Sequence, residues 1–307
     1  MNITLPDGST RELKEGSTGL DLAMDIGPGL AKAAIAVTIN GDQKDLCDPI
    51  EGDSEVSIIT IDSSEGLEIM RHTLTAQVLA RAVKNLYPDT KLAIGPTITN
   101  GFYYDFEFTK PISPDDLQKI EKEMKRIIDI KSSITKTFHS KEDAIKVFKE
   151  KGELYKESII QESDQEDNFQ LYSQDNNEFV DLCRGPHLPS LKHIGSFKLT
   201  KLAGAYWKGD SKNKMLTRIY GTAWKNDKDL NAYLHSLEEA EKRDHRKLGK
   251  EMNLFHFQEE APGMVFWHPN GWTIYRLLQD FIRSKLQKYN YKEINTPLVV
   301  DRKLWEA

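Results

Sequence analysis

The sequence predicts an α+β protein of several domains, on three observations. Apolar and β-branched residues cluster or alternate in short runs typical of strands, as in residues 35–39 (IAVTI) and 102–108 (FYYDFEF). Apolar residues recur at helical spacing over residues 74–86 and 117–128. The 307 residues are enough for two or three domains, each with a buried core of its own.

Residues 1–61 are predicted to form a small β-grasp domain. A hairpin, a helix and then further strands is the element order of that fold. The expected elements are a hairpin turning at residues 6–8, a helix over residues 17–26, and strands at residues 35–39 and 56–59. The unit contains no histidine and one thiol, so we expect a folding or docking module without chemistry of its own.

Residues 62–226 are predicted to form a second domain of mixed α/β structure. The helices expected at residues 74–86 and 117–128 and the strand at residues 102–108 belong to it, together with aromatic-rich strands between residues 182 and 224. We expect residues 1–61 to pack loosely on this second domain.

A single amphipathic linker helix is predicted for residues 227–252. Leu230, Leu234 and Leu237 share one face, and charged residues fill the other. The cations at its end, in residues 242–250, complement the helix dipole. They also offer a contact for an RNA backbone, which is the alternative to a plain linker.

Composition and charge argue against several classes of protein. The formal net charge of −6 excludes a protein that holds nucleic acid by global positive charge, so an RNA contact must come from a local patch. Cys47 and Cys183 show neither disulfide-framework nor zinc-finger spacing, which indicates a reducing compartment. The N-terminus has no signal-peptide pattern, and no run approaches the roughly 18 apolar residues of a membrane span. We therefore expect a cytoplasmic protein without a membrane partner.

Residues 181–187 (DLCRGPH) carry the most chemical content. They place Cys183 and His187 four residues apart, and Gly185-Pro186 between them excludes an ordinary helix. A thiol and an imidazole held by a rigid turn can ligate a metal or move a proton. A buried thiol beside an ordinary histidine is the plainer alternative for such a pair taken alone.

Four runs of the chain resemble one family, the threonyl-tRNA synthetases. In family order they are residues 93–96 (AIGP) with 100–105 (NGFYYD), residues 181–187 (DLCRGPH), residues 203–210 (AGAYWKGD) with 218–224 (RIYGTAW), and residues 243–249 (RDHRKLG). The resemblance implies a TGS domain at residues 1–61, an editing domain at 62–226, a linker helix at 227–252, and the incomplete start of a class II catalytic core at 253–307.

The resemblance implies a threonine–tRNA ligase, which uses ATP to charge tRNA(Thr) with threonine. Residues 291–297 (YKEINTP) resemble motif 1, through which class II enzymes form homodimers. ATP, Mg²⁺ and the catalytic zinc would be held by residues beyond 307, so we expect no metal site and no ATP–pyrophosphate exchange from these residues alone. We also expect residues 253–307 to expose apolar surface.

Hydrolytic proofreading is the physically expected companion of threonine activation. Threonine and serine differ by one methyl group, which a pocket distinguishes by only about 1–3 kcal/mol. The family hydrolyses seryl-tRNA with a Cys-x-x-x-His turn and a His-x-x-x-His pair on a helix. The implied catalytic residues here are Cys183, His187, His72, Lys156 and Asp181, and the implied substrate-binding residues are Tyr104, Gln77 and Thr73.

Within that set, Lys156 and Tyr104 match residues that position the substrate or the attacking water, and Asp181 matches one that recognises the amino acid. A surface lysine and a core tyrosine are the alternatives for the first two.

The helical histidine pair is interrupted in this chain. Counting forward from His72 puts its second member at Ala76, whereas counting back from Lys84 puts the pair at Thr73 and Gln77. A glutamine can orient a water molecule but cannot deprotonate it near neutral pH. We therefore expect a metal-free cleft with weakened hydrolysis of seryl-tRNA, and faster hydrolysis after both Thr73 and Gln77 are changed to histidine.

Two other interpretations remain open on the sequence: a free-standing hydrolase that edits mischarged tRNA in trans, and a non-catalytic tRNA-binding module derived from a synthetase. The motif 1 segment argues against both, because neither has a use for half of a synthetase dimer interface.

Overall fold

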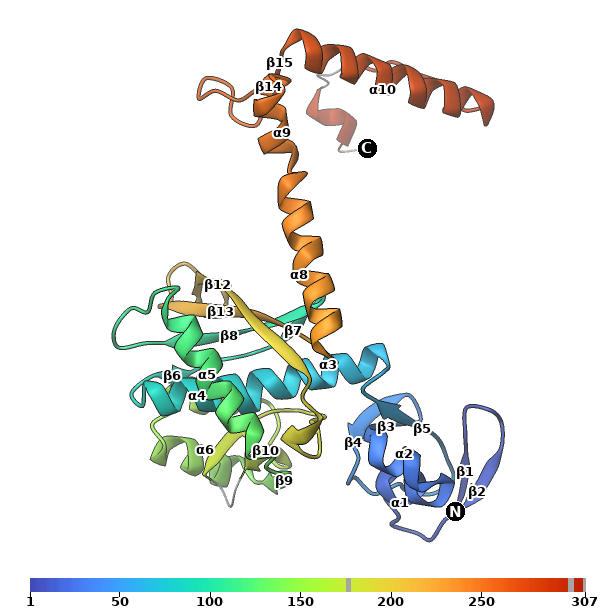
Figure 1. Ribbon diagram of the computed structural model, residues 1–307, viewed down its shortest axis with the longest axis vertical. Coiled ribbons are helices and arrows are strands. Elements are labelled where there is room, and N and C mark those ends of the chain that lie inside the picture. The colour runs from blue at the N-terminus through green and yellow to red at the C-terminus, as the bar shows by residue number, and fades with distance from the viewer. Residues whose placement is uncertain (175–177, 298–300, 306–307) are drawn as a thin grey trace. The chain divides into compact units, whose positions relative to one another are not determined.

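A computed structural model describes residues 1–174, 178–297 and 301–305 (Figure 1). The chain divides into two units, Met1–Ala232 and Tyr233–Ala307, which are considered separately below. Of the predicted last domain, residues 298–300, 306 and 307 lie outside the described residues. Helices and strands alternate through the first unit, so the predicted mixture of α and β structure is confirmed.

The N-terminal domain has the element order expected of a β-grasp domain. Its five strands lie in the order β2-β1-β5-β3-β4, with β1 parallel to β5 and the other neighbours antiparallel. Two helices pack on this sheet. The bounds are β1 Asn2–Thr4, β2 Thr10–Glu12, α1 Gly19–Ile26, α2 Pro28–Ala33, β3 Ala34–Ile39, β4 Asp42–Asp45 and β5 Ser54–Thr60.

Local sequence explains where these helices begin. The Thr18 hydroxyl accepts a hydrogen bond from the backbone N–H of Asp21, whose carboxylate accepts the N–H of Thr18 in return, forming a capping box. The short helix α2, which the apolar pattern did not predict, begins at Pro28, because proline suits the first helical position.

The second domain contains two sheets and the helices that cover them. One sheet has the order β12-β13-β8-β6, with β7 paired to β8, and the other has the order β11-β10-β9. The strands are β6 Lys91–Leu92, β7 Thr97–Ile98, β8 Gly101–Glu107, β9 Ile134–His139, β10 Phe169–Gln174, β11 Phe179–Leu182, β12 Ser196–Tyr206 and β13 Met215–Trp224. The helices are α3 Ser64–Thr73, η1 Leu74–Leu79, α4 Ala80–Leu86, α5 Asp116–Asp129, α6 Lys141–Glu150 and α7 Leu154–Gln161.

The helical run α3–η1–α4 and the helix α5 cover one face of the larger sheet (Figure 1). Apolar residues from both helices and from β8 and β13 form one buried core, which includes Leu74, Val78, Phe102, Ile120 and Ile219. The predicted helical stripes therefore face the sheet, as burial of apolar surface requires.

The segment η1, residues Leu74–Leu79, is a π-helix and not an α-helix. A π-helix holds more residues per turn than an α-helix and is frequent at functional sites. The turn lies between His72 and Lys84. Counting forward from His72 and counting back from Lys84 place the helical histidine pair at positions that differ by one residue. A π-helical turn holds about one residue more than an α-helical turn, which is the size of that difference.

The loose packing expected between the first two domains is wrong. Lys136 of β9 forms ion pairs with Asp45 and Asp48 of the N-terminal domain, and these side chains are largely buried. Tyr172 of β10 donates a hydrogen bond to Asp45 across the same boundary. In the sequence Asp45 and Asp48 look like ordinary turn acids, because their partners lie about ninety residues or more further along the chain.

The single linker helix predicted for residues 227–252 is also wrong. Helix α8, Asp227–Lys242, is followed by a separate helix α9, His245–Glu251. Asp244 ends the continuity, because its carboxylate accepts the backbone N–H of Arg246 and caps α9.

The second unit continues with β14 Phe255–His256, β15 Phe266–Trp267, α10 Pro269–Lys288 and η5 Arg302–Trp305. The apolar exposure predicted for this region is confirmed for the described residues. Along and after α10 the exposed side chains include Trp272, Leu277, Leu278, Phe281, Ile282, Leu286 and Ile294. No helix in the described part of the chain has the length and apolar character needed to cross a membrane.

Candidate functional site

A cavity of about 770 Å³ lies within the first unit. Residues of α3, η1, β8, α7, β10 and β11 line it, so six elements of the second domain meet there. Its volume is in the range of pockets that enclose a drug-sized ligand. Of the residues predicted for the site, its walls carry His72, Tyr104, Lys156, Asp181 and Cys183.

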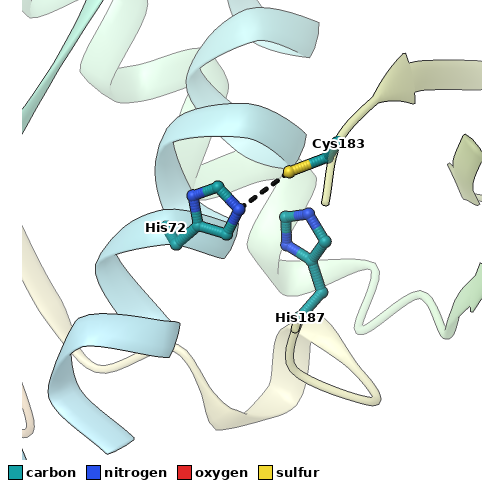
Figure 2. Close-up of side chains that lie close together, drawn as sticks. All are labelled: His72, Cys183 and His187. Carbon is teal, nitrogen blue, oxygen red and sulfur yellow. Dashed lines mark hydrogen bonds between the residues drawn. The ribbon is translucent and has the colours of Figure 1, made fainter. Parts of the chain in front are cut away.

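Cys183 and two imidazoles lie close together, and Cys183 and His72 line this cavity (Figure 2). His72, near the end of α3, places its Nε2 atom 2.8 Å from the sulfur of Cys183. The ring of His187 stacks on the ring of His72, with 4.6 Å between centroids and an interplanar angle of 13°. Cys183 and His187 come from one turn after β11, and α3 brings His72 to them from 111 residues away.

Backbone conformation in the turn brings Cys183 and His187 into the same site. Gly185 has a φ of +68°, a conformation that other residues adopt only with strain. A Cβ atom at this position would also come within 2.0 Å of the Tyr172 hydroxyl. The peptide bond to Pro186 is cis. The Gly-Pro pair noticed in the sequence is therefore needed for the shape of this turn.

His187 is buried behind the cavity wall and held from α3. Its Nδ1 atom lies 3.1 Å from the Thr73 hydroxyl oxygen, which also accepts the backbone N–H of Leu188 at 2.9 Å. Its Nε2 atom has no hydrogen-bond partner among the residues described, and Figure 2 shows it turned toward the sulfur of Cys183. With the Thr73 hydroxyl donating to Nδ1, the neutral ring carries its proton on Nε2, beside that sulfur.

A buried ion pair forms another part of the site. Lys156 of α7 lies 2.7 Å from the Asp181 carboxylate of β11, and the Tyr104 hydroxyl donates to the same carboxylate at 3.3 Å. Lys156 and Asp181 are 4% and 1% exposed, so neither the surface-lysine nor the plain core-tyrosine alternative describes this cluster. Gly95 permits the arrangement, because a Cβ there would come within 2.2 Å of the Tyr104 ring.

Burial controls the protonation of these groups. Desolvation lowers the pKa values of both His72 and His187. The carboxylate of Asp181 opposes this effect at His72, and Cys183 opposes it at His187. Both imidazoles are therefore neutral at pH 7. Burial raises the pKa of the Asp181 carboxyl, while Lys156 and the hydrogen bonds from Leu182 and Tyr104 act in the other direction.

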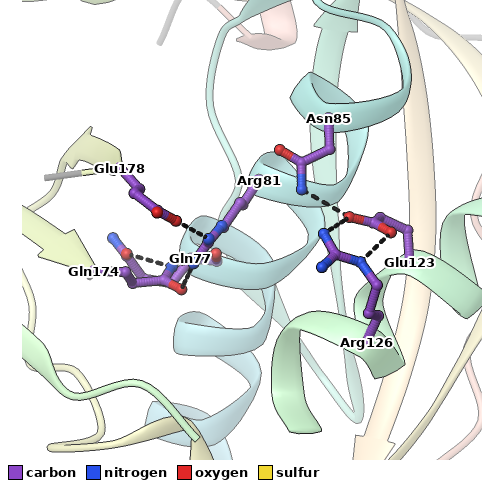
Figure 3. A network of polar contacts seen from close by, with 7 residues as sticks. All are labelled: Gln77, Arg81, Asn85, Glu123, Arg126, Gln174 and Glu178. Carbon is purple, nitrogen blue, oxygen red and sulfur yellow. Dashed lines mark hydrogen bonds and ion pairs between the residues drawn. The ribbon is translucent and has the colours of Figure 1, made fainter. Parts of the chain in front are cut away.

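Thr73 and Gln77 do not line the cavity with the other residues of the predicted site. Both are fully buried. Figure 3 shows Gln77 in a network with Gln174, whose side-chain nitrogen donates to the backbone and side-chain oxygens of Gln77 at 2.6 and 3.0 Å. His72 and Ala76 line the cavity in their place. These are the two positions that counting forward from His72 assigns to the helical histidine pair.

Three of these residues offer the donor types that bind zinc. His72, Cys183 and His187 each present one ligand atom, and these atoms lie within 4.8 Å of one another. Around a tetrahedral zinc ion, sulfur and nitrogen ligands are roughly 3.6 Å apart and their lone pairs converge. Here His72 and Cys183 are 2.8 Å apart and the two rings are nearly parallel. This contact suits a hydrogen-bonded group, and the three residues also supply three of the four ligands that a structural zinc site uses.

Sequence reasoning missed several residues that the structure brings to the site. Arg184 lines the cavity, and Asp45 and Tyr172 contact His187. Arg184 lies inside the run of residues 181–187, so its position was a usable signal. Asp45 carried none, because 142 residues separate it from His187.

Comparisons with known proteins agree with this architecture. Residues 1–60 match the TGS domain family, and residues 170–220 match the family described as the threonyl and alanyl tRNA synthetase second additional domain. Similar curated proteins are threonine–tRNA ligases from Hahella chejuensis (55% identical over 304 residues), Paramagnetospirillum magneticum (56% over 307) and Maricaulis maris (53% over 308).

These matches cover 99%, 99% and 100% of this chain, and 47%, 48% and 47% of the respective relatives. The chain thus spans about half the length of the curated relatives it matches.

Proposed function

The chain is similar over nearly its whole length to the N-terminal half of threonine–tRNA ligases, and on that basis we propose that it is the corresponding region of such an enzyme. Within it, we assign to the cavity the hydrolysis of seryl-tRNA, the product of mistaken serine activation. The observation that carries this assignment is the contact of His72 with Cys183 in a cavity that the Lys156–Asp181 pair also lines.

His72 is the proposed general base. Its ring is neutral at pH 7 because burial lowers its pKa, so it can take a proton from a water molecule. The water oxygen bonds to the ester carbonyl carbon, and the resulting tetrahedral intermediate breaks its bond to the ribose oxygen. The imidazolium then returns the proton to that oxygen, and serine and tRNA leave.

Cys183 and His187 orient the base in this scheme. The Cys183 sulfur lies at hydrogen-bond distance from the His72 ring and lines the cavity, where it can also contact the water. His187 is not at the cavity wall, so it acts through its stacking on His72 and its proximity to the sulfur. We treat it as a positioning residue.

The Lys156–Asp181 pair suits recognition of the amino acid. The Asp181 carboxylate can accept hydrogen bonds from the ammonium group of serine, and Lys156 and Tyr104 hold that carboxylate in place. Arg184 is exposed at the rim and offers a guanidinium to a phosphate of the tRNA end.

The remaining assignments follow from the likeness to the ligases. We assign residues 1–61 to the TGS domain, 62–226 to the editing domain, 227–252 to the linker and 253–307 to the start of a class II catalytic core. The whole enzyme would charge tRNA(Thr) with threonine, use ATP with Mg²⁺ and a catalytic zinc, form a homodimer through the motif 1 region, and act in the cytoplasm. Gln77 and Thr73 support the helix in this proposal and do not touch substrate.

The test is deacylation of tRNA(Thr) charged with serine. The 307-residue chain should hydrolyse it faster than buffer alone, and His72→Ala and Cys183→Ala should each reduce the rate, by about 10²-fold for the base. His235→Ala is the matched control, because it removes an exposed imidazole from α8. Binding of tRNA without hydrolysis by the unmodified chain would favour the non-catalytic module instead.

A further inference from the structure

The TGS domain reaches the hydrolytic site through one carboxylate. Asp45 is the last residue of β4 and is 5% exposed. Its Oδ1 atom accepts the backbone N–H of His187 at 2.7 Å, and its Oδ2 atom accepts the Tyr172 hydroxyl at 2.7 Å. The ammonium of Lys136 lies 2.7 Å from the same Oδ2 atom. Both carboxylate oxygens are thus occupied by groups of the second domain.

These contacts determine where the His187 ring lies. The Asp45 bond holds the backbone of the residue itself, and Tyr172 packs edge-on against the imidazole with 4.3 Å between ring centroids. Thr73 holds Nδ1 from the other side. Because the His187 ring stacks on the His72 ring, the position of His187 also constrains the position of His72, the proposed base.

Asp45, Asp48, Lys136 and Tyr172 form a cluster between the two domains. The contacts that join the domains and the contacts that position His187 involve different atoms of this cluster. Lys136 pairs with both Asp45 and Asp48, so its ammonium joins the domains. The hydrogen bonds to His187 and Tyr172 belong to Asp45, whereas Asp48 accepts the backbone N–H of Asp45. A variant at Lys136 therefore removes the ion pairs and leaves the contacts between Asp45 and the site in place.

We propose that Asp45 of the TGS domain is a positioning residue of the hydrolytic site, which makes that domain part of the editing apparatus and not merely an appended module. The proposal rests on the assignment of seryl-tRNA hydrolysis to the cavity. It corrects the expectation that residues 1–61 contribute nothing to the chemistry.

Asp45→Asn and Lys136→Met form the decisive pair of variants. Both remove the Asp45–Lys136 ion pair, and the first also replaces one of the two acceptors with a donor. The kcat and KM of seryl-tRNA deacylation and the melting temperature are measured for each. We expect Asp45→Asn to lower kcat about tenfold or more with little change in KM, because misplacement of a catalytic group by about 1 Å can cost 10²-fold. Lys136→Met should lose at least as much melting temperature and keep kcat within about threefold.

Two further variants keep the comparison sound. Asp42→Asn removes an exposed carboxylate from the same strand and should leave kcat unchanged. Tyr172→Phe removes one hydroxyl without changing charge, and a severalfold loss of kcat is expected even if Asp45→Asn folds poorly. Equal loss of kcat in Asp45→Asn and Lys136→Met would reduce the role of Asp45 to domain docking and overturn the proposal.

Histidine-selective NMR separates this proposal from the proposed function. The ring signals of His187, assigned with a His187→Gln variant, should move in Asp45→Asn and stay in place in Lys136→Met, with His235 as an internal reference. This readout holds even if the unmodified chain hydrolyses no seryl-tRNA, which would contradict the assignment of the cavity alone. If the His187 signals do not move in folded Asp45→Asn, the positioning role of Asp45 is contradicted, while the assignment of the cavity is unaffected.

Discussion

At the scale of single residues, the site depends on which side chains of one helical run face the cavity. Counting along the sequence leaves open whether His72 or the pair Thr73 and Gln77 occupies that face. In the structure His72 contacts Cys183, while Thr73 and Gln77 are buried on other faces. The buried environment also lowers the pKa of the His72 imidazole, so the proposed base is neutral under ordinary conditions.

This protonation predicts the pH dependence of deacylation. Desolvation, the largest cause, lowers the pKa of His72 below its usual 6.5, so kcat/KM should rise with pH through that lowered value and be level by about pH 7. The measurement is kcat/KM for seryl-tRNA between about pH 5 and pH 8. His72→Gln should remove the acidic limb. An acidic limb centred above the ordinary pKa of histidine would contradict this assignment.

The same geometry reverses the expectation that histidines at positions 73 and 77 would speed hydrolysis of seryl-tRNA. Changing both Thr73 and Gln77 to histidine should now lower the melting temperature and the rate, because each buried hydrogen bond lost costs about 1–3 kcal/mol and the core has no room for two larger rings. Ala76→His is the matched change on the cavity face. It should retain more stability and raise the deacylation rate severalfold, since its imidazole has open space beside His72. Faster deacylation by the double variant would show that Thr73 and Gln77 occupy the positions of the helical histidine pair.

At the scale of elements, the π-helix η1 and the strand β10 are joined by amides rather than by apolar contacts alone. Gln174 of β10 donates to Gln77 of η1, and its side-chain oxygen accepts from Arg81 of α4 (Figure 3). Arg81 also pairs with the exposed Glu178. The helical turn that departs from α geometry is thus tied to the sheet that supplies Asp181.

Gln174→Leu tests this connection. It leaves the buried guanidinium of Arg81 and the carbonyl of Gln77 each short of a partner, and we expect a loss of about 2–4 kcal/mol in the free energy of unfolding. Urea unfolding followed by circular dichroism measures it. Glu178→Gln is the control and should cost less than about 1 kcal/mol, because that partner is largely exposed. Equal losses in the two variants would show that the network contributes nothing beyond its surface pair.

At the scale of the whole molecule, the chain consists of two units, and the second unit contains a helix break near its start. The site and both of its supporting domains lie in residues 1–232, whereas the apolar surface of α10 lies in the second unit. Between α8 and α9, Arg243 and Asp244 lie outside the helices, and the neighbouring Lys242, Arg243 and Arg246 side chains are exposed.

Limited proteolysis should therefore divide the chain at this break. Trypsin at low ratio is expected to cut first within residues 242–247, because cleavage requires an exposed backbone that can leave helical geometry. Mass spectrometry identifies the cut, and the larger product should keep most of the deacylation rate because it retains the complete cavity. A first cut inside residues 62–226, or loss of activity on cleavage at 242–247, would contradict the assignment of the complete site to the first unit.

The sequence was sufficient for the features that depend on local or periodic information. Alternation and helical spacing predicted the β-grasp order of residues 1–61 and the helices that cover the larger sheet, because each element must bury one apolar face. The run of residues 181–187 identified Cys183 and His187, because Gly-Pro restricts the backbone wherever it occurs. Asp244 in a charged helix was a capping signal that the periodic pattern concealed.

Tertiary structure alone decided which residues meet. His72 contacts Cys183 from α3, and Gln77 faces elsewhere in a π-helical turn that spacing rules do not contain. The partnership of Asp45 with His187 joins residues 142 positions apart, and a lone aspartate after a strand gives no indication of what it will face. Local sequence determines the elements and their chemistry, whereas the contacts between elements arise from the packing of the entire first unit, where burial makes an unpaired polar group costly.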